Sequence, residues 1–235
     1  MTPLRATTHL AYGANQLFDG WISTLRESGI NIHGSVSNNA SLDADVVFAC
    51  GLLTATRIRD GQALSVVAAP LFANETSAVY RSVIVARQDK GINALEPGGM
   101  LRLAVNEYGS WSGWHGFKEY LRLGAVPSSA IGEIVESGGH ASSIDAVLDD
   151  CADVASIDHS VWEARLLVDP RLKVLSVIAT TRNWPAPPIS VRSTLPMGLR
   201  NHLKQAITAL PGIVTATQSD YAFMLAEVDE HPTWP

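Results

Sequence analysis

Short apolar segments of strand type alternate with segments of helical spacing through most of the chain, and this alternation constrains the fold more than any other feature. The segment 101–105, LRLAV, has the pattern of a buried strand. Trp114, Phe117 and Leu121 follow it at i, i+3 and i+7, on one face of a helix. Alternating strands and helices predict an α/β fold with a largely parallel sheet.

One segment interrupts this pattern and divides the chain into two lobes. The three prolines of TTRNWPAPPIS, residues 180–190, force extended backbone and prevent a helix from continuing. We therefore interpret it as a connector. The first lobe is expected to comprise residues 1–78 and 184–235, and the second lobe residues 79–183. A chain that crosses twice between two α/β lobes has a ligand cleft between them and two hinges.

Composition excludes several classes of protein. With 46% hydrophobic and 17% charged residues, the 235-residue chain has ample apolar material for a core and is not disordered. The formal net charge of −6 argues against a nucleic-acid partner, which needs a basic face. A small anion remains compatible with this charge, because local dipoles and hydroxyls can bind one. No apolar run approaches the roughly 18–20 residues of a membrane span.

The cysteines and histidines show no metal-binding spacing. Cys50 and Cys151 lie far apart, outside any C-x-x-C motif, and the seven histidines form no H-x-x-x-H or H-x-H pair. We therefore expect neither a metal nor a cofactor, while a single disulfide remains open. The first residues, MTPLRATTHLAYG, lack the apolar core of a signal peptide. Either the protein is cytoplasmic or a leader has been removed; Met1 favours the first.

The loop GSWSG, residues 109–113, follows the strand 101–105 and admits three interpretations. If the helix begins at Ser112, its first amides have no acceptor within the helix and can bind an oxyanion together with the hydroxyls. Alternatively, Ser112 caps its own helix. The third interpretation is a serine nucleophile, but Trp111 occupies the centre of the loop, so the G-x-S-x-G motif is missed by one position.

Other polar residues follow predicted strands, where loops of a parallel sheet converge. His140 in SGGH can donate a hydrogen bond to an anion or pack against its neighbours. Asp158 can accept a hydrogen bond from a ligand or cap the next helix, for which Ser160 and Glu163 also form a capping-box pattern. Ser112, His140 and Asp158 together are the members of a possible catalytic triad. Tyr12 can contribute a phenolic donor or be partly buried.

Four phrases in order carry a resemblance to a known family. They are YRSVIVARQDKGINAL, NEYGSWSGW, SGGHASSIDAVLDDCADVASIDHSVWE and TTRNWPAPP. This arrangement resembles the phosphate/phosphite/phosphonate-binding proteins of ABC importers, a branch of the periplasmic binding protein superfamily with a two-lobed type II fold. The resemblance runs from about Ala11 to Leu210. It implies a non-catalytic protein that binds a small anionic solute such as a phosphonate or phosphate, and it is compatible with an ABC permease as partner.

The resemblance also implies roles for individual residues. In that family the serine loop binds the phosphoryl oxygens, a role that maps to Ser110, Ser112 and Gly113. The remaining implied ligand contacts come from both lobes: His140, Asp158 and Tyr80 in the second, and Tyr12, Cys50 and Gly51 in the first. Trp111 stands beside the anion site, where it either lines the pocket for an aromatic group or packs in the core.

An alternative function remains open at this point. An enzyme or ligand sensor on the same fold, acting on a small heterocyclic or phosphorylated metabolite, would also suit a polar cleft that contains His140, Cys50 and Asp158. Catalysis requires a nucleophile and a base within about 2.6–3.2 Å, or one water between them. The sequence leaves monomer and homodimer equally open.

Overall fold

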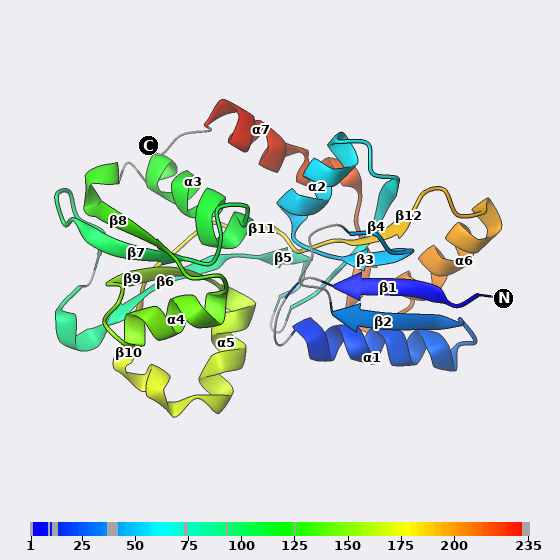
Figure 1. The fold of residues 1–235 in the computed structure, drawn as a ribbon, viewed down its shortest axis with the longest axis horizontal. Helices are drawn as coiled ribbons and strands as arrows, with labels where there is room; N and C mark the ends of the chain where they lie inside the picture. The colour runs from blue at the N-terminus through cyan, green and yellow to red at the C-terminus, as the bar shows by residue number, and fades with distance from the viewer. Residues whose placement is uncertain are drawn as a thin grey trace. The chain divides into compact units, whose positions relative to one another are not determined.

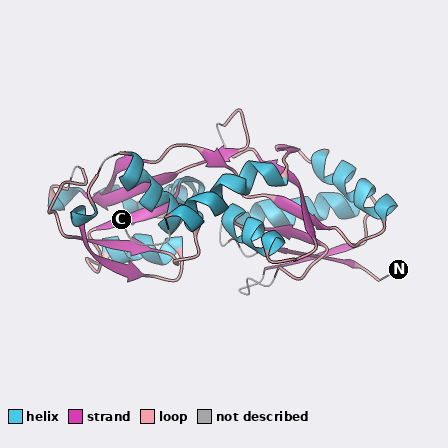
Figure 2. Cartoon of the chain, turned by 90° about the horizontal axis from the view of Figure 1, so that it is seen from above, coloured by secondary structure: helices cyan, strands magenta, loops and turns pink. Residues whose placement is uncertain are grey.

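The structure is a computed structural model, shown in Figures 1 and 2. It describes most of the chain; for residues 14–16 it describes the backbone alone. The described residues are 2–8, 10, 14–36, 42–72, 75–92, 94–124 and 126–231.

The contacts within the chain divide it into two compact units. Unit 1 comprises Met1–Val79 and Pro185–Leu225, and unit 2 comprises Tyr80–Trp184 and Ala226–Pro235. The first two crossings therefore fall one residue after the predicted boundaries 78/79 and 183/184. The sequence predicts only two crossings, and the contacts add a third at 225/226, because the end of the chain belongs with unit 2.

Unit 1 is built on a six-stranded sheet of order β13-β4-β12-β3-β1-β2. β1 pairs in parallel with β2 and with β3, whereas β12 is antiparallel to both β3 and β4, and β13 is antiparallel to β4. Its strands are β1 (Leu4–Thr8), β2 (Ile32–Val36), β3 (Val46–Phe48), β4 (Leu64–Pro70), β12 (Ile189–Arg192) and β13 (Ile213–Thr215).

Helices cover the sheet of unit 1. α1 and α6 bury their apolar residues against it in one cluster that includes Phe18, Phe48 and Leu203. A separate buried cluster around Val47 includes Leu53 of α2. The helices are α1 (Ala14–Glu27), α2 (Gly51–Arg59), α6 (Met197–Thr208), the 3-10 turn η5 (Gln218–Tyr221) and α7 (Ala222–Glu230), which extends across the third crossing.

Unit 2 is built on a five-stranded sheet of order β10-β6-β9-β7-β8. β7 pairs in parallel with β8 and β9, whereas β6 is antiparallel to β9 and to β10. Its strands are β6 (Ser82–Arg87), β7 (Leu101–Val105), β8 (Ile131–Glu136), β9 (Val154–Asp158) and β10 (Leu175–Thr180). A separate two-stranded sheet pairs β5 (Val79–Tyr80) with β11 (Trp184–Pro185), the strands in which the first two crossings fall.

The helices of unit 2 cover its sheet, with α3 and α4 drawn above and below the strands in Figure 1. The buried residues Trp114, Phe117 and Leu121 pack with Leu103 and Val154 of the sheet, as their helical spacing predicts. The helical segments are η1 (Gln88–Lys90), the π-helical turn η2 (Trp111–His115), α3 (Gly116–Leu123), η3 (Ser128–Ala130), α4 (His140–Leu148), α5 (His159–Val168) and η4 (Pro170–Val174).

The two sheets share one strand order, which explains where the sequence prediction is right and where it is wrong. Each contains three parallel strands in the order second, first, third, followed by an antiparallel strand: β2-β1-β3-β12 in unit 1 and β8-β7-β9-β6 in unit 2. The α/β class is confirmed, but the sheets are mixed rather than largely parallel. In such a sheet the point between the first and third strands, where the strand order reverses, is a favoured ligand position.

Local predictions around two segments need correction. The apolar pattern of residues 79–87 predicts one continuous strand, but the strand is interrupted at Arg81. The predicted capping box does not form: Asp158 is the N-cap of α5, Ser160 donates to it, and Glu163 lies 3.2 Å from the ring of His159. A short acceptor directly before the helix therefore takes the capping position.

The buried residue Tyr221 provides a test of packing and hydrogen bonding within unit 1. Its ring is 1% exposed, and its hydroxyl donates to the carbonyl oxygen of Ala186 at 2.6 Å. Tyr221→Phe leaves that buried carbonyl without its donor, so we expect a loss of about 1 kcal/mol in the free energy of unfolding. Urea unfolding measures this loss, and an unchanged midpoint would contradict it. Tyr108→Phe, at an exposed tyrosine, is the control.

Candidate functional site

The predicted serine loop forms the start of the helix η2–α3 in unit 2. Ser110 is its N-cap, and the Ser110 Oγ accepts a hydrogen bond from the amide of Gly113 at 3.2 Å. The Ser110 carbonyl accepts from the amides of Trp114 and His115, and the amide of Gly116 donates to the carbonyl of Trp111, which defines a π-helical turn. Ser110 therefore uses its oxygen as an acceptor and keeps its hydroxyl proton for another partner.

Ser112 is held on both its backbone and its side chain. Its carbonyl oxygen accepts hydrogen bonds from the hydroxyls of Ser82 on β6 and Ser156 on β9, each at 2.8 Å. Its own Oγ lies 3.0 Å from Nε2 of His140. The interpretation in which Ser112 caps the helix is therefore wrong, because Ser110 holds that position. Ser112 instead lies in the first turn, 5% exposed.

His140 opens α4 and reaches Ser112 from the neighbouring loop. Burial lowers the pKa of His140 to about 4, and a backbone hydrogen bond involving Ser156 opposes the shift. The ring is therefore neutral near pH 7 and carries one N–H. If that proton is on Nε2, it donates to the Oγ of Ser112, and the hydroxyl proton of Ser112 is left for a ligand.

Gly113 has a packing role that the sequence does not indicate. A Cβ added at Gly113 would lie 1.7 Å from Oδ1 of Asn106. The side chain of Asn106 thus occupies the space that a larger residue would need, and the carbonyl of Asn106 accepts from the amide of Gly138. Asn106 therefore connects the serine loop to the glycine-histidine loop.

Asp158 ends β9 at the edge where β7 and the serine loop also lie. Its carboxylate accepts hydrogen bonds from the amide and the hydroxyl of Ser160, at 2.9 and 2.7 Å. Burial raises the pKa of Asp158 to about 6, against the lowering effect of those bonds. Asp158 thus caps α5 and is bonded to Ser160 rather than to His140, so Ser112, His140 and Asp158 do not form the geometry of a catalytic triad.

Two predicted aromatic contacts lie in a buried cluster. The ring of Trp111 is 0% exposed and meets the ring of Trp184 edge to face, with centroids 5.7 Å apart. Tyr80 is 4% exposed and also meets the ring of Trp184 edge to face, with centroids 5.8 Å apart. Of the two alternatives for Trp111, packing in the core is therefore the one that its burial fits.

The ligand contacts predicted for the first lobe lie in unit 1 or outside the residues that the structure describes. Tyr12 lies outside the described residues. Cys50 is the N-cap residue of α2 and makes no side-chain cap hydrogen bond, and neither Cys50 nor Cys151 of unit 2 is in a disulfide. A Cβ at Gly51 would lie 2.7 Å from the ring of Tyr221, so the start of α2 is packed closely against that ring.

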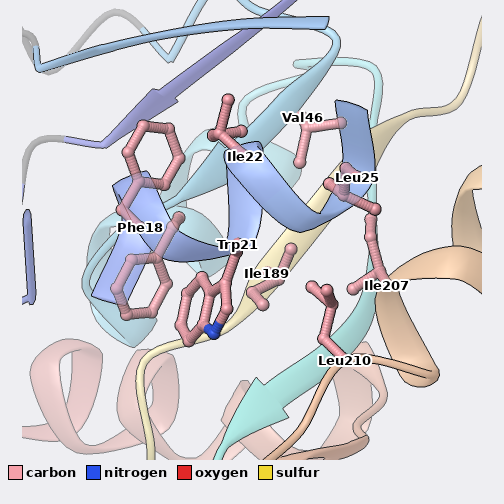
Figure 3. Close-up of a pocket in the computed structure, with 9 residues that line it drawn as sticks. Phe18, Trp21, Ile22, Leu25, Val46, Ile189, Ile207 and Leu210 are labelled. Atoms are coloured by element: carbon pink, nitrogen blue, oxygen red, sulfur yellow. The ribbon is translucent and has the colours of Figure 1, made fainter. Parts of the chain in front are cut away.

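Figure 3 shows a small cavity in unit 1 that differs in chemistry from the candidate site. It has a volume of about 10 Å³ and is lined by apolar side chains of α1, β3, β12 and α6 and by Leu210. A buried water needs two to four polar partners, which this lining does not provide. The cavity is therefore a packing gap of the core.

Within the described ranges, no group of three or more His, Cys, Asp or Glu side chains could hold a metal ion. None of the helices described there combines the length and apolar character needed to cross a bilayer.

Sequence reasoning missed the residues that support the serine loop. Ser82 and Ser156 are fully buried, yet they lie within the apolar strands RSVIV and VASID. A hydroxyl within a buried apolar segment needs a hydrogen-bond partner, and this is the signal that could have identified both serines.

Comparison with known proteins assigns the chain to a family. Residues 30–221 match the model of the family described as "ABC transporter, phosphonate, periplasmic substrate-binding protein". The chain belongs to this family. Its members are substrate-binding proteins of transporters, so the enzyme alternative from the sequence is not supported. A comparison with curated protein sequences finds no match.

Solved structures with the same fold include several binding proteins. PhnD1 of Prochlorococcus marinus, in complex with methylphosphonate, is 17% identical with a TM-score of 0.80, over 97% of this chain and 98% of that one. The binding protein component of an ABC phosphonate transporter from Pseudomonas aeruginosa is 15% identical with a TM-score of 0.77, over 96% and 85%. A Xanthomonas citri protein bound to ATP is 17% identical with a TM-score of 0.69, over 98% of both chains. These similarities confirm the type II periplasmic-binding-protein fold.

Proposed function

We propose that this phosphonate-family protein binds a small anionic solute of the phosphonate, phosphite or phosphate type and delivers it to an ABC permease. The observation that carries the proposal is the pairing of Ser112 with a neutral, buried His140 beside the helix start capped by Ser110. With the single ring proton of His140 on Nε2, this arrangement leaves the hydroxyl protons of Ser110 and Ser112 for an oxyanion, next to the positive end of the η2–α3 dipole.

The site binds by neutral donors rather than by a cation. The protonated form of His140 is disfavoured by burial, so the charge of the ligand is balanced by hydrogen bonds and by the helix start. Asp158 adds an acceptor for a ligand that carries an amine or a P–OH proton. In this proposal Gly113 holds the turn in place through Asn106, while Tyr80 and Trp111 support the helix instead of touching the solute.

The first lobe completes the site in the proposal. Tyr12, Cys50 and Gly51 close over the solute when the two units approach each other around the crossings. Ligand contacts made only in the closed state provide the driving force. Transport of this kind belongs to the periplasm, where the family functions, and the permease then receives the closed, loaded protein.

Isothermal titration calorimetry with methylphosphonate, phosphite and phosphate tests the proposal. Each is expected to bind if the oxyanion group is the part that is recognised, with the tightest ligand indicating the natural class. Absence of binding by all three, with a folded protein by circular dichroism, would contradict the ligand class.

Ser112→Ala tests the placement of the site. It removes a hydroxyl that donates to a charged group, worth about 1.5–3 kcal/mol, so affinity for the tightest ligand should fall by roughly tenfold to a hundredfold. Ser176→Ala on the edge strand β10 is the matched control and should bind like the unmodified protein. Equal affinity of Ser112→Ala and the control would place the solute elsewhere.

A further inference from the structure

Two segments of unit 2, one just after the first crossing and one just before the second, are linked by hydrogen bonds to the helix that begins at the serine loop. Ser82, two residues after the first crossing, donates from Oγ to the carbonyl of Ser112. The backbone of Ser82 pairs with Thr181, which lies shortly before the second crossing: Ser82 N donates to Thr181 Oγ1 at 2.9 Å, and Thr181 N donates to Ser82 O at 3.0 Å. Both segments therefore meet at the π-helical turn η2.

Glu119 on α3 is the buried centre of the second connection. Its side chain is 2% exposed and accepts hydrogen bonds from three donor groups on the segment before the crossing. Arg182 donates from Nε to Oε2 at 2.9 Å and from its terminal nitrogen to Oε1, and Trp184 Nε1 donates to Oε2 at 2.7 Å. One carboxylate thus fixes both the guanidinium and the indole.

The indole of Trp184 in turn contacts the π-helical turn itself. Its ring lies against Gly116, where an added Cβ would be 2.4 Å from Cη2, and meets Trp111 edge to face at 5.7 Å. A π-helical turn has weaker internal support than an α-helix and is frequent at functional sites. Here the support comes from outside: hydroxyls on the carbonyl of Ser112 and the indole held by Glu119.

We propose that Glu119 is a positioning residue: it holds Trp184 and the segment before the second crossing against the turn that carries Ser112, so that solute binding and the geometry of that crossing are coupled. This inference rests on the proposed function for its effect on affinity. Its structural part, the effect of Glu119 on the turn, does not depend on any ligand.

The test compares Glu119→Gln with a matched variant, Asp153→Asn. Glutamine keeps an acceptor for the indole but loses the charge that Arg182 binds. Asp153 likewise accepts two guanidinium hydrogen bonds, from Arg102, but lies directly before β9, at the end of that strand remote from the turn. Both variants lose a carboxylate–arginine pair, so an effect of general destabilisation appears in both.

Amide hydrogen exchange of the ligand-free proteins is the first measurement. We expect Glu119→Gln to raise exchange at Trp111–His115 by about tenfold, corresponding to about 1.4 kcal/mol of lost protection, relative to Asp153→Asn. Unchanged exchange at the turn, or the same increase in both variants, would overturn the proposal.

Calorimetry with methylphosphonate is the second measurement. We expect Glu119→Gln to bind about tenfold more weakly than the unmodified protein, and Asp153→Asn to bind equally well. Faster exchange at the turn with unchanged affinity would overturn the coupling. If the unmodified protein binds none of the three oxyanions, the proposed function fails, while the exchange measurement still decides the role of Glu119.

Discussion

Arg182→Ala is expected to lower the free energy of unfolding by about 3 kcal/mol, although Arg182 itself lies partly at the surface. The reason is the burial of its partner. The side chain of Glu119 is 2% exposed, whereas that of Arg182 is 52% exposed. Among the described residues, removing the guanidinium leaves the buried carboxylate with the indole of Trp184 as its one donor, and such an uncompensated charge is costly.

Neutralising Glu119 instead of removing Arg182 should lower the free energy of unfolding by much less. In Glu119→Gln the guanidinium of Arg182 can return to water, and glutamine still accepts from Trp184, so we expect a loss of about 1 kcal/mol. Urea unfolding of the two variants measures the difference. A loss of about 1 kcal/mol or less in both variants would show that the pair behaves as an ordinary surface ion pair, whose median contribution is about 0–1 kcal/mol.

This asymmetry also guides the choice of variant for binding studies. Glu119→Gln changes the connection to the crossing while the protein stays folded, whereas Arg182→Ala combines lost positioning with lost stability. The hydrogen bond to Glu119 raises the pKa of Arg182, so the guanidinium remains charged throughout the pH range of either experiment.

The sequence predicts those elements whose pattern is locally complete. The strand LRLAV lies between the turn residues PGG at 97–99 and polar Asn106, and it appears as β7 at the predicted residues 101–105. In contrast, the sequence does not predict α2, because GLLTATRIR has no capping side chain before it, and Cys50 makes no cap in the structure. It does not predict β12 either, because this strand directly follows prolines that the sequence marks as a connector.

Other features depend on contacts between distant segments and leave no local signal. The antiparallel placement of β6 and β12 follows from the return of the chain at the crossings. The third crossing, at 225/226, depends on contacts of the chain's end with unit 2, such as the pair of Glu227 and Arg122 at 2.6 Å. At the candidate site, the residue types and their positions after strands identify Ser112 and His140 from the sequence. Only the structure shows that Ser156 and Ser82 donate hydrogen bonds to the carbonyl of Ser112.

Stability between pH 4 and 6.5 is expected to reflect opposing effects of three groups. Burial lowers the pKa of His140 and of His115 to about 4, from 6.5. In this window the unfolded chain binds more protons at these histidines, so stability rises with pH, by about 3 kcal/mol for each. Asp158 has the opposite effect: its pKa is raised from 3.8 to about 6, so the folded chain binds more protons and stability falls by about 3 kcal/mol as pH rises.

The sum is a net rise of about 3 kcal/mol from pH 4 to 6.5 in the unmodified protein. Asp158→Asn removes the opposing fall, so its rise should be about twice as large. His115→Gln removes one of the two rises and should leave stability nearly independent of pH in this window. Urea unfolding at half-unit intervals of pH measures all three profiles.

Asp153→Asn is the control for these profiles. The hydrogen bond from Arg102 lowers the pKa of Asp153 below 3.8, so this carboxyl titrates below the window and its loss should shift the profile without changing its slope. Parallel profiles for Asp158→Asn and the control would show that Asp158 is already ionised at pH 5 in the folded chain. The carboxyl beside the serine loop would then repel an anionic solute at every pH of interest, and only a ligand with its own proton or amine would be accepted there.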